Sequence, residues 1–377
     1  MKLPANPTFA RMDSPYRENF PPAFYARFPV ERLTPEQTDE LLENGWFRHN
    51  TLVSTFAIKN MDNTLRSTVM LRLPLQNFTW KQRLRKLMRR NEQAFSVKIQ
   101  PCQFTEEKDL LWQKFKQEVH RWSGVFTLDK HLMAGFPAEN FNTWEVSVRY
   151  EGRLVAFSVF DLGRRSLGSL EAAYDPAFSK YSLGLWTMLL EIDFAQRQGL
   201  EFFYPGFLPK DLPMFNYKLR PGGLQFYRFL EKRWLPLEQL APRDWMLERV
   251  GERLAVLQQA IQTAGGAARL IFSPHYFKPT GGFDVALEAY NFMLLILNPE
   301  NPAGGWHFLA AWDVQAERYF LFFANVGQGL ASLAKISTAP VLHLFGVAER
   351  QFLGKFLNEI EMLERLKTGN LLNPLLH

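Results

Sequence analysis

Two short stretches of the 377-residue chain combine residue types that could take part in chemistry. In the first, AAYDPAFSKYSLGLW, Tyr174, Asp175 and Lys180 follow a strand-like segment, and Ser182 and Gly184 open a helix-like one. A helix N-terminus exposes backbone N–H groups and carries partial positive charge, so together with Lys180 it suits a phosphate. The structural alternative is a serine N-cap followed by a glycine that permits close packing.

The second stretch is FFYPGFLPKDLPMFNYKLRPGG, where proline, glycine and polar residues gather after a strand-like segment. Clefts are often built at such strand ends. Tyr217, Lys218 and Arg220 are candidates to bind an anion or to polarise a carbonyl group. A surface loop whose lysine and arginine stems cover apolar surface would have the same composition.

A third stretch, WKQRLRKLMRRN at residues 80–91, contains six cations and no acid. Its apolar residues recur at the helical period and predict one stripe, formed by Trp80, Leu84, Leu87 and Met88. The cations that cover the rest of the helix, without acids to pair with, are Lys81, Arg83, Arg85, Lys86, Arg89 and Arg90. Such a helix is either a solvated basic face or a surface for a phosphate-rich partner.

The composition of the chain and the motifs that it lacks limit the classes of function that the protein can have. A hydrophobic fraction of 47% against 22% charged residues indicates a globular chain, and the net charge of +6 favours an anionic partner. Cys102 is the only cysteine, which excludes an internal disulfide and a cysteine-built metal site. The sequence has no HExxH, P-loop or GxSxG motif, so we expect neither a metal nor a cofactor. It also lacks an apolar leader and any long apolar run, which predicts a cytoplasmic protein without a membrane partner.

The elements that must position these stretches suggest three domains. In residues 1–91, an extended proline-rich arm, a capped helix (LTPEQTDELLENG) and the β-like segment STVMLRLPLQNF precede the basic helix. In residues 92–235, a helix over 108–122 is followed by three strands, a helix ending at Gly199 and the strand EFFYPGF. Antiparallel strands followed by strand, helix and strand are the element order of a GNAT-type acyltransferase core.

The third predicted domain, residues 236–377, has a different pattern. A helix over 243–263 precedes the strand-like segments VALEAYNFMLLILN, WHFLAAWDV and RYFLFFANV, and a second helix is expected over 348–367. The predicted fold class is therefore α+β: a GNAT-like acyltransferase core with an N-terminal α/β segment and an additional C-terminal α+β domain.

Four ordered elements resemble one protein family. GWFRHN is similar to the GWRRSG element of arginyl-tRNA-protein transferases, and the segment ending in the basic run and RRN resembles theirs and that of the bacterial leucyl-transferring relatives. The YDP, SLG and YPG series, and FNYKLRP, resemble the family motifs in the same order. The resemblance covers roughly residues 31–234.

The resemblance implies an enzyme that moves an amino acid from charged tRNA to the N-terminal amine of a protein, as in N-degron formation. Tyr174 or Asp175 would assist deprotonation of the amine, because an α-amine has a pKa of about 7.7 to 8.0. Lys218 or backbone N–H groups would stabilise the oxyanion. The basic helix would bind acceptor-stem phosphates, with Lys180, Ser182, Gly184, Tyr217 and Arg220 as further contacts to substrate.

The family's cysteine pairs are missing. Pro21 and Pro22 stand where the N-terminal pair is usual, and NTLVSTFAIKNMDN replaces the cysteines ahead of the basic run. Metal-dependent or redox-regulated behaviour is therefore not implied for this chain. Two other functions are compatible with the residues: a GNAT-type acyl-CoA N-acyltransferase, and a catalytically inactive binding protein with the same fold.

Overall fold

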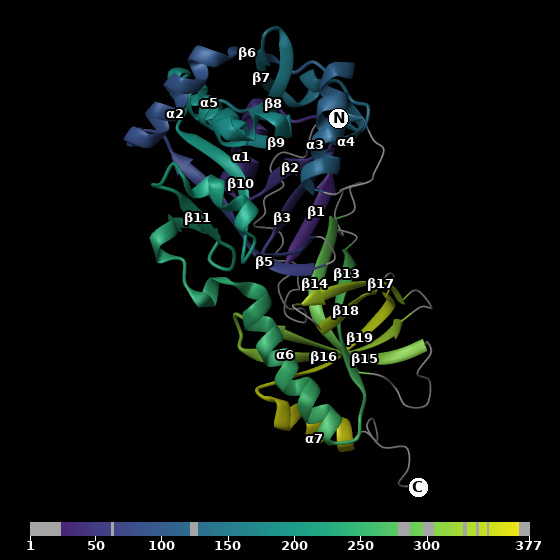
Figure 1. Ribbon diagram of the computed structural model, residues 1–377. Coiled ribbons are helices and arrows are strands. Elements are labelled where there is room, and N and C mark those ends of the chain that lie inside the picture. Colours follow the sequence, from purple (N-terminus) through teal and green to yellow (C-terminus); the bar gives the residue numbers. More distant parts are fainter. Residues whose placement is uncertain are drawn as a thin grey trace. The chain divides into compact units, whose positions relative to one another are not determined.

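The computed structural model describes residues 24–61, 64–120, 127–277, 287–296, 305–326, 330–336, 339–344 and 347–368. The chain forms two compact units, labelled by element in Figure 1. The first consists of Met1–Phe28, Phe56–Thr68 and Trp245–His377, and the second of Pro29–Thr55 and Val69–Asp244. Neither unit is one continuous segment, and the three-domain division expected from the sequence stays a prediction.

The second unit is built on a mixed sheet in the order β6-β7-β8-β9-β10-β5-β11-β12. β6 to β9 pair antiparallel, whereas β9 and β10 pair parallel and are connected by helix α5. The strands of this unit are β2 (Phe47–His49), β3 (Leu52–Phe56), the second half of β5 (Thr64–Pro74), β6 (Ser96–Pro101), β7 (Thr143–Tyr150), β8 (Arg153–Leu162), β9 (Ser166–Tyr174), β10 (Phe202–Pro209), β11 (Gln225–Arg228) and β12 (Arg233–Pro236).

Helices cover both faces of this sheet. α5 packs on β8 and β9 from one side, where Phe194 contacts Phe160, and α3 packs on the same strands from the other, where Lys116 pairs with Glu171. α2 lies against α5 (Figure 1). The helices are α1 (Pro35–Glu43), α2 (Gln82–Ala94), α3 (Glu106–His120), α4 (Leu128–Met133) and α5 (Leu183–Arg197), with 3₁₀ helices η3 (Ala138–Phe141), η4 (Pro176–Tyr181), η5 (Pro213–Leu219), η6 (Leu237–Gln239) and η7 (Pro242–Asp244).

The first unit joins an antiparallel sheet, β13-β14-β15-β16-β19, to the helix α6, whose apolar stripe is buried against β13, β14 and β15. β1 pairs with β14, and β18 pairs with β13 and β17. Its elements are β1 (Tyr25–Pro29), β4 (Ile58–Met61), the first half of β5, α6 (Met246–Thr263), β13 (Ala268–Phe277), β14 (Leu287–Ile296), β15 (Gly305–Asp313), β16 (Arg318–Val326), β17 (Leu330–Ile336), β18 (Ala339–Leu344), β19 (Val347–Phe356) and α7 (Glu359–Thr368).

Local signals predicted many elements correctly. The α+β class is confirmed, and α1 begins with a complete capping box in which Thr34 Oγ1 accepts from the Gln37 N–H and Gln37 Oε1 accepts from the Thr34 N–H. The basic helix begins at Gln82 instead of Trp80, because Lys81 is its extended N-cap residue. The expected arm spans residues 14–33: residues 14–23 lie outside the described residues, and the described remainder contains the extended strand β1.

The helix predicted over residues 348–367 is wrong in its first half. β19 occupies Val347–Phe356 and pairs antiparallel with β16, and α7 begins only at Glu359. A spacing of four between aromatic residues occurs in strands as well as in helices, and Gly354 lowers the helix propensity of this segment. Residues 347–356 form a strand because they pair with β16. The spacing of apolar residues in the sequence does not reveal this pairing.

Candidate active site

The parallel strands β9 and β10 separate after a short ladder. Their pairing runs from Phe202↔Ser166 to Tyr204↔Gly168 and ends there, although β9 continues to Tyr174 and β10 to Pro209. In open α/β sheets ligands bind at the carboxyl ends of strands, where neighbouring strands diverge. We call this divergence, bounded by Gly168 and Tyr204, the strand split.

A β-bulge in β9 reorients the side chains beside the strand split. Phe160 pairs with Ser169 and Val159 pairs with Glu171, so Leu170 is the extra residue of the ladder. Ser169 therefore faces α5, as Phe160 does, whereas Glu171 faces α3 and α4. The bulge also leaves the Leu170 backbone without a partner residue in the register with β8.

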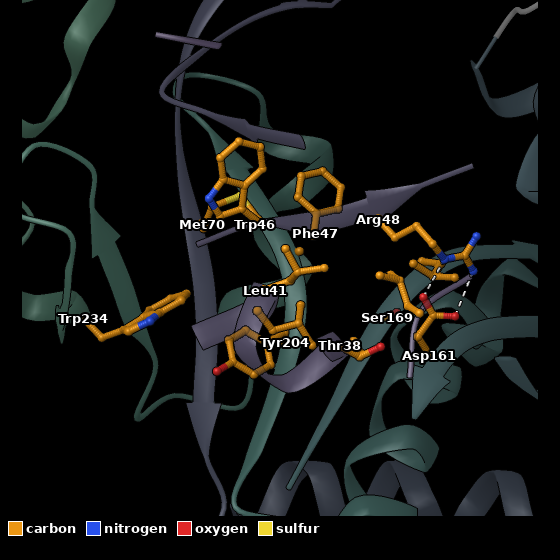
Figure 2. A pocket seen from close by; sticks show the side chains of 15 residues that line it. Thr38, Leu41, Trp46, Phe47, Arg48, Met70, Asp161, Ser169, Tyr204 and Trp234 are labelled. Atoms are coloured by element: carbon orange, nitrogen blue, oxygen red, sulfur yellow. Dashed lines mark hydrogen bonds and ion pairs between the residues drawn. The ribbon is translucent and has the colours of Figure 1, made fainter. Parts of the chain in front are cut away.

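A pocket opens at the strand split (Figure 2). Its cavity volume is only about 20 Å³, and its walls come from α1, β2, β5, β8, β9, β10 and β12. The side chains are mainly apolar, among them Leu41, Leu42, Trp46, Phe47, Met70 and Trp234. Its one ion pair is saturated: Arg48 Nε and Nη2 donate to the two Asp161 carboxylate oxygens at 2.7 and 2.8 Å, and the Thr143 hydroxyl donates to Oδ1 at 2.7 Å.

Lys218 lies on η5 and approaches the strand split from the β10 side. Its ammonium donates to the Phe207 carbonyl at 3.0 Å and lies over the Phe207 and Phe215 rings, and the residue is 8% exposed. Gly206 is adjacent: its φ of +87° suits glycine, and an added Cβ would lie 3.4 Å from Nζ. Because Gly206 also lines the pocket, Lys218 and the pocket share this stretch of β10.

Two tyrosines predicted as site residues lie on the same side. Burial, followed by the negative charges of Glu191 and Glu171, raises the pKa of the Tyr217 hydroxyl, although 37% of the residue is exposed. The ring of Tyr174 covers Gly184 at the start of α5, where an added Cβ would meet Tyr174 Cε1 at 3.2 Å. The Tyr217 hydroxyl therefore stays protonated at neutral pH, and the Tyr174 ring packs against Gly184.

Asp175 has a different environment from the one expected of a base. Its carboxylate accepts from Lys114 Nζ at 2.8 Å, from Arg153 Nη2 at 2.9 Å and from the Ala177 N–H at 3.1 Å. Burial opposes the charged form, but the Lys114 contact and these other donors outweigh it and lower the pKa of Asp175. Asp175 thus caps η4, and its oxygens are engaged by the protein itself.

Glu191 is a candidate that the sequence reasoning missed. It lies in the middle of α5, it is 0% exposed, and neither carboxyl oxygen has a hydrogen-bond partner among the described residues. Burial raises the pKa of Glu191 to about 8, while the nearby Ser158 and Ser169 hydroxyls and the Lys218 charge favour its ionised form. The available signal was a single acid inside the apolar run LWTMLLEI, which an amphipathic-helix interpretation does not explain.

The cations of α2 form a basic surface, which we define as Lys81, Arg83, Arg85, Lys86, Arg89 and Arg90. All six are exposed, and no ion pair joins them to a carboxylate in the part of the chain that the structure describes. The helix is anchored by buried Leu84, Met88 and Asn91. At its start Arg83 donates to the Arg220 carbonyl at 3.4 Å, which brings Arg220 to the basic surface.

The end of α2 is joined to the start of α5. The buried Asn91 side chain donates to the Tyr181 carbonyl at 2.9 Å, and Arg90 lies over the Tyr181 ring at 5.5 Å. Lys180 lies over the same ring, and Ser182, at φ +52° and without a side-chain cap hydrogen bond, precedes α5. The basic surface is therefore connected through Tyr181 to the N–H groups that open α5.

The described part of the chain offers no evident metal centre. In the described ranges, no three His, Cys, Asp or Glu side chains gather at a spacing suited to a metal ion. Burial raises the pKa of the Cys102 thiol to about 12, so it stays protonated. No described helix has the length and apolar composition needed to cross a membrane.

The antiparallel strands, the parallel β9–α5–β10 unit and its strand split define a GNAT-like acyltransferase core. Residues 107–228 match the family described as arginine-tRNA-protein transferase, C terminus. The chain is 23% identical to an aspartate/glutamate leucyltransferase of Leptospira interrogans, over 64% of this chain and 93% of that protein. It is 29% identical to that of Pseudomonas fluorescens, over 44% and 70%.

The chain is also similar to a yeast protein and to solved structures. Arginyl-tRNA–protein transferase 1 of Saccharomyces cerevisiae is 25% identical over 40% of this chain and 35% of that protein. FemX gives a TM-score of 0.28 at 10% identity, over 41% and 58% of the two chains. A GCN5-related N-acetyltransferase of Kribbella flavida gives 0.23 at 12% identity, over 41% and 57%. The sequence matches show that the chain is similar to arginyl- and leucyl-tRNA-protein transferases over the matched residues.

Proposed function

We propose that this protein transfers an aminoacyl group from charged tRNA to the N-terminal amine of a protein in the cytoplasm, in the manner of N-degron formation. The observation that carries the proposal is the connection of a GNAT-like strand split to an exposed, unpaired basic surface through Tyr181. An acyl-CoA enzyme needs a phosphate cradle at the start of α5, but the Tyr174 ring covers Gly184 there. A tRNA needs a long cationic surface, which α2 provides.

The reaction requires stabilisation of an oxyanion. The amine nitrogen attacks the ester carbonyl carbon, and the carbonyl oxygen becomes negatively charged in the tetrahedral intermediate. In our proposal a backbone N–H of the bulge at Leu170 and the Lys218 ammonium face this oxygen from β9 and β10. Preorganised donors of this kind are each worth about 2.7 to 4 kcal/mol in the transition state.

The pocket at the strand split would take the side chain of the transferred amino acid. Its apolar walls suit an aliphatic or aromatic group, and the saturated Arg48–Asp161 pair leaves no free carboxylate for a guanidinium. With only about 20 Å³ enclosed, the lining side chains must move to admit such a group. We therefore propose an apolar amino acid, of the leucine type, as the one transferred.

The roles of the remaining residues follow from their positions. The basic surface, with Arg220 at its start and Lys180 and Ser182 at its end, would bind phosphates of the acceptor stem and the 3′ end. Exposed Tyr217 would contact substrate at the mouth of the strand split. Tyr174 and Asp175 would position the start of α5 and η4 instead of removing a proton, because their contacts serve packing and capping.

The proposal is tested by mixing purified protein with radiolabelled aminoacyl-tRNAs, one amino acid at a time, and peptides that carry each possible N-terminal residue. We expect label on the peptide N-terminus, more from leucyl-tRNA than from arginyl-tRNA. No label, with an active family member labelling its own substrate in parallel, would favour an inactive binding protein. Label from acyl-CoA but not from tRNA would favour the acyl-CoA enzyme.

A further inference from the structure

A group of unsatisfied polar atoms lies beneath the strand split. Both carboxyl oxygens of Glu191 and the Ser158 hydroxyl have no hydrogen-bond partner among the described residues, and the two residues are 0% and 1% exposed. Buried polar groups in folded proteins are nearly always paired, because an unpaired one costs about 1 to 3 kcal/mol. A fully buried carboxyl without a partner therefore needs a reason.

The surroundings of Glu191 connect it to the cleft. Ser158 of β8 and Ser169 of β9 lie near its carboxyl, and Ser169 also lines the pocket in Figure 2. From η5, Lys218 and Tyr217 are the charged and titratable groups close enough to interact with Glu191 electrostatically. Ser169 is thus the residue common to the surroundings of the buried carboxyl and the lining of the pocket.

We propose that Glu191 is the proton acceptor of the transfer reaction and that the Ser169 hydroxyl links it to the acceptor amine in the strand split. The inference rests on the proposed function and adds the group that activates the nucleophile. It also gives Ser169 a role that depends on the bulge, because the bulge turns Ser169 toward α5 while Glu171 faces the opposite side.

The ammonium of the protein N-terminus gives one proton to Ser169 Oγ, and the Ser169 hydroxyl proton passes to the Glu191 carboxylate. The free amine then attacks the ester carbon, the C–N bond forms, and the C–O bond to the ribose breaks. The second amine proton goes to the leaving ribose oxygen, and Glu191 returns its proton to solvent after product release.

The acidity of Glu191 suits this step. A general base works best when its pKa lies near the operating pH and near that of the group it deprotonates. Burial places the pKa of Glu191 at about 8, and an ordinary α-amine has a pKa of about 7.7 to 8.0. The Ser158 and Ser169 hydroxyls and the Lys218 charge favour the ionised form of Glu191, which is the form that can accept a proton.

The test compares Glu191→Gln with Asp193→Asn, an acid-to-amide change on the same helix. Asp193 is partly exposed and pairs with Arg197, away from the cleft. We expect the single-turnover transfer rate at saturating aminoacyl-tRNA to fall about 100-fold or more in Glu191→Gln and to stay within twofold in Asp193→Asn. Glu191→Asp should restore part of the rate.

A second acceptor separates proton transfer from a merely structural role. A peptide with an N-terminal alkoxyamine, which is unprotonated at neutral pH, needs no base to become nucleophilic. The defect of Glu191→Gln should therefore nearly vanish with this peptide. An equal loss with both acceptors, or an unchanged rate with the ordinary amine, would overturn the role of Glu191. Failure of the wild-type protein to transfer from tRNA would instead overturn the proposed function.

Discussion

Two carboxyl groups near the strand split show how surroundings assign different roles to similar side chains. The Asp175 carboxylate accepts hydrogen bonds from two cations and a backbone N–H, and these contacts lower the pKa of Asp175. Burial instead raises the pKa of Glu191 to about 8. A charged acid held by cations positions a loop, and a buried acid can carry a proton at neutral pH. Sequence motifs direct attention to Asp175, because it lies in a loop beside other polar residues.

The raised pKa of Glu191 predicts a pH dependence of stability. Below about pH 4.5 the group is protonated in the folded and the unfolded chain, and between about 4.5 and 8 only the folded chain retains the proton. The unfolded state thus binds fewer protons in this window, so the free energy of unfolding falls as the pH rises. At about 1.4 kcal/mol per pH unit, wild type should lose about 4 to 5 kcal/mol relative to Glu191→Gln by pH 8. Urea unfolding of both proteins at pH 5 and pH 8.5 measures this loss, and parallel pH profiles would contradict it.

Lys218 allows a second prediction at the residue scale. Its ammonium is held at the Phe207 carbonyl beside Gly206, within the strand split and away from the exposed basic surface. Lys218→Ala should therefore lower the single-turnover rate about 100-fold, equivalent to about 2.7 kcal/mol, and leave tRNA affinity largely intact. The exposed Lys180 provides the contrast, since Lys180→Ala should weaken tRNA binding and spare the rate at saturation. An affinity loss for Lys218→Ala with an unchanged saturated rate would place a phosphate at Lys218 instead.

At the scale of elements, the basic surface of α2 predicts salt-dependent RNA binding. Arg85→Glu with Arg89→Glu should reduce tRNA affinity at least about tenfold at low salt, because each charge-assisted contact is worth about 1.5 to 3 kcal/mol. The reduction should shrink as salt rises. A matched control reverses two exposed cations elsewhere, Lys98 and Arg318, with the same change in net charge. Filter binding at several salt concentrations measures both, and equal losses in the two variants would indicate a net-charge effect only.

Elements set by local signals could be predicted from the sequence, and those set by distant partners could not. The capping box of α1 and the turns at Glu151–Gly152 lie within a few residues, so both were evident. The bulge at Leu170 arises from pairing between β8 and β9, and β19 arises from pairing with β16. The same holds for the residues of the candidate site. Lys218 and the cations of α2 lie in recognisable sequence motifs. The burial of Glu191 without a hydrogen-bond partner among the described residues depends on how β8, β9 and η5 pack around α5, which the sequence does not show.

At the scale of the whole molecule, the first unit draws on three separate parts of the chain. Phe56–Thr68 belongs to it together with Trp245–His377, and Phe56, Ile58 and Leu65 are at most 2% exposed there. Ser67 connects the two segments, since its hydroxyl accepts from the Leu247 N–H at 2.8 Å and donates to Glu248. The segment 56–68 therefore depends on residues 245–377 for its burial.

A chain truncated after Asp244 should therefore not behave as an autonomous transferase. Exposure of Phe56, Ile58 and Leu65 would cost about 1.5 to 3 kcal/mol for each side chain, and the sum is comparable to the 5 to 15 kcal/mol that stabilises an ordinary domain. We expect the truncated chain to aggregate, or to unfold at a clearly lower temperature than the full chain. Ser67→Ala in the full chain is the control, because it removes hydrogen bonds but no apolar burial and should cost only about 1 to 3 kcal/mol. Thermal unfolding and size-exclusion chromatography measure these outcomes. A truncated chain that is monomeric and unfolds cooperatively at the same temperature as the full chain would contradict the prediction. It would show that residues 24–244 fold without the C-terminal part of the first unit.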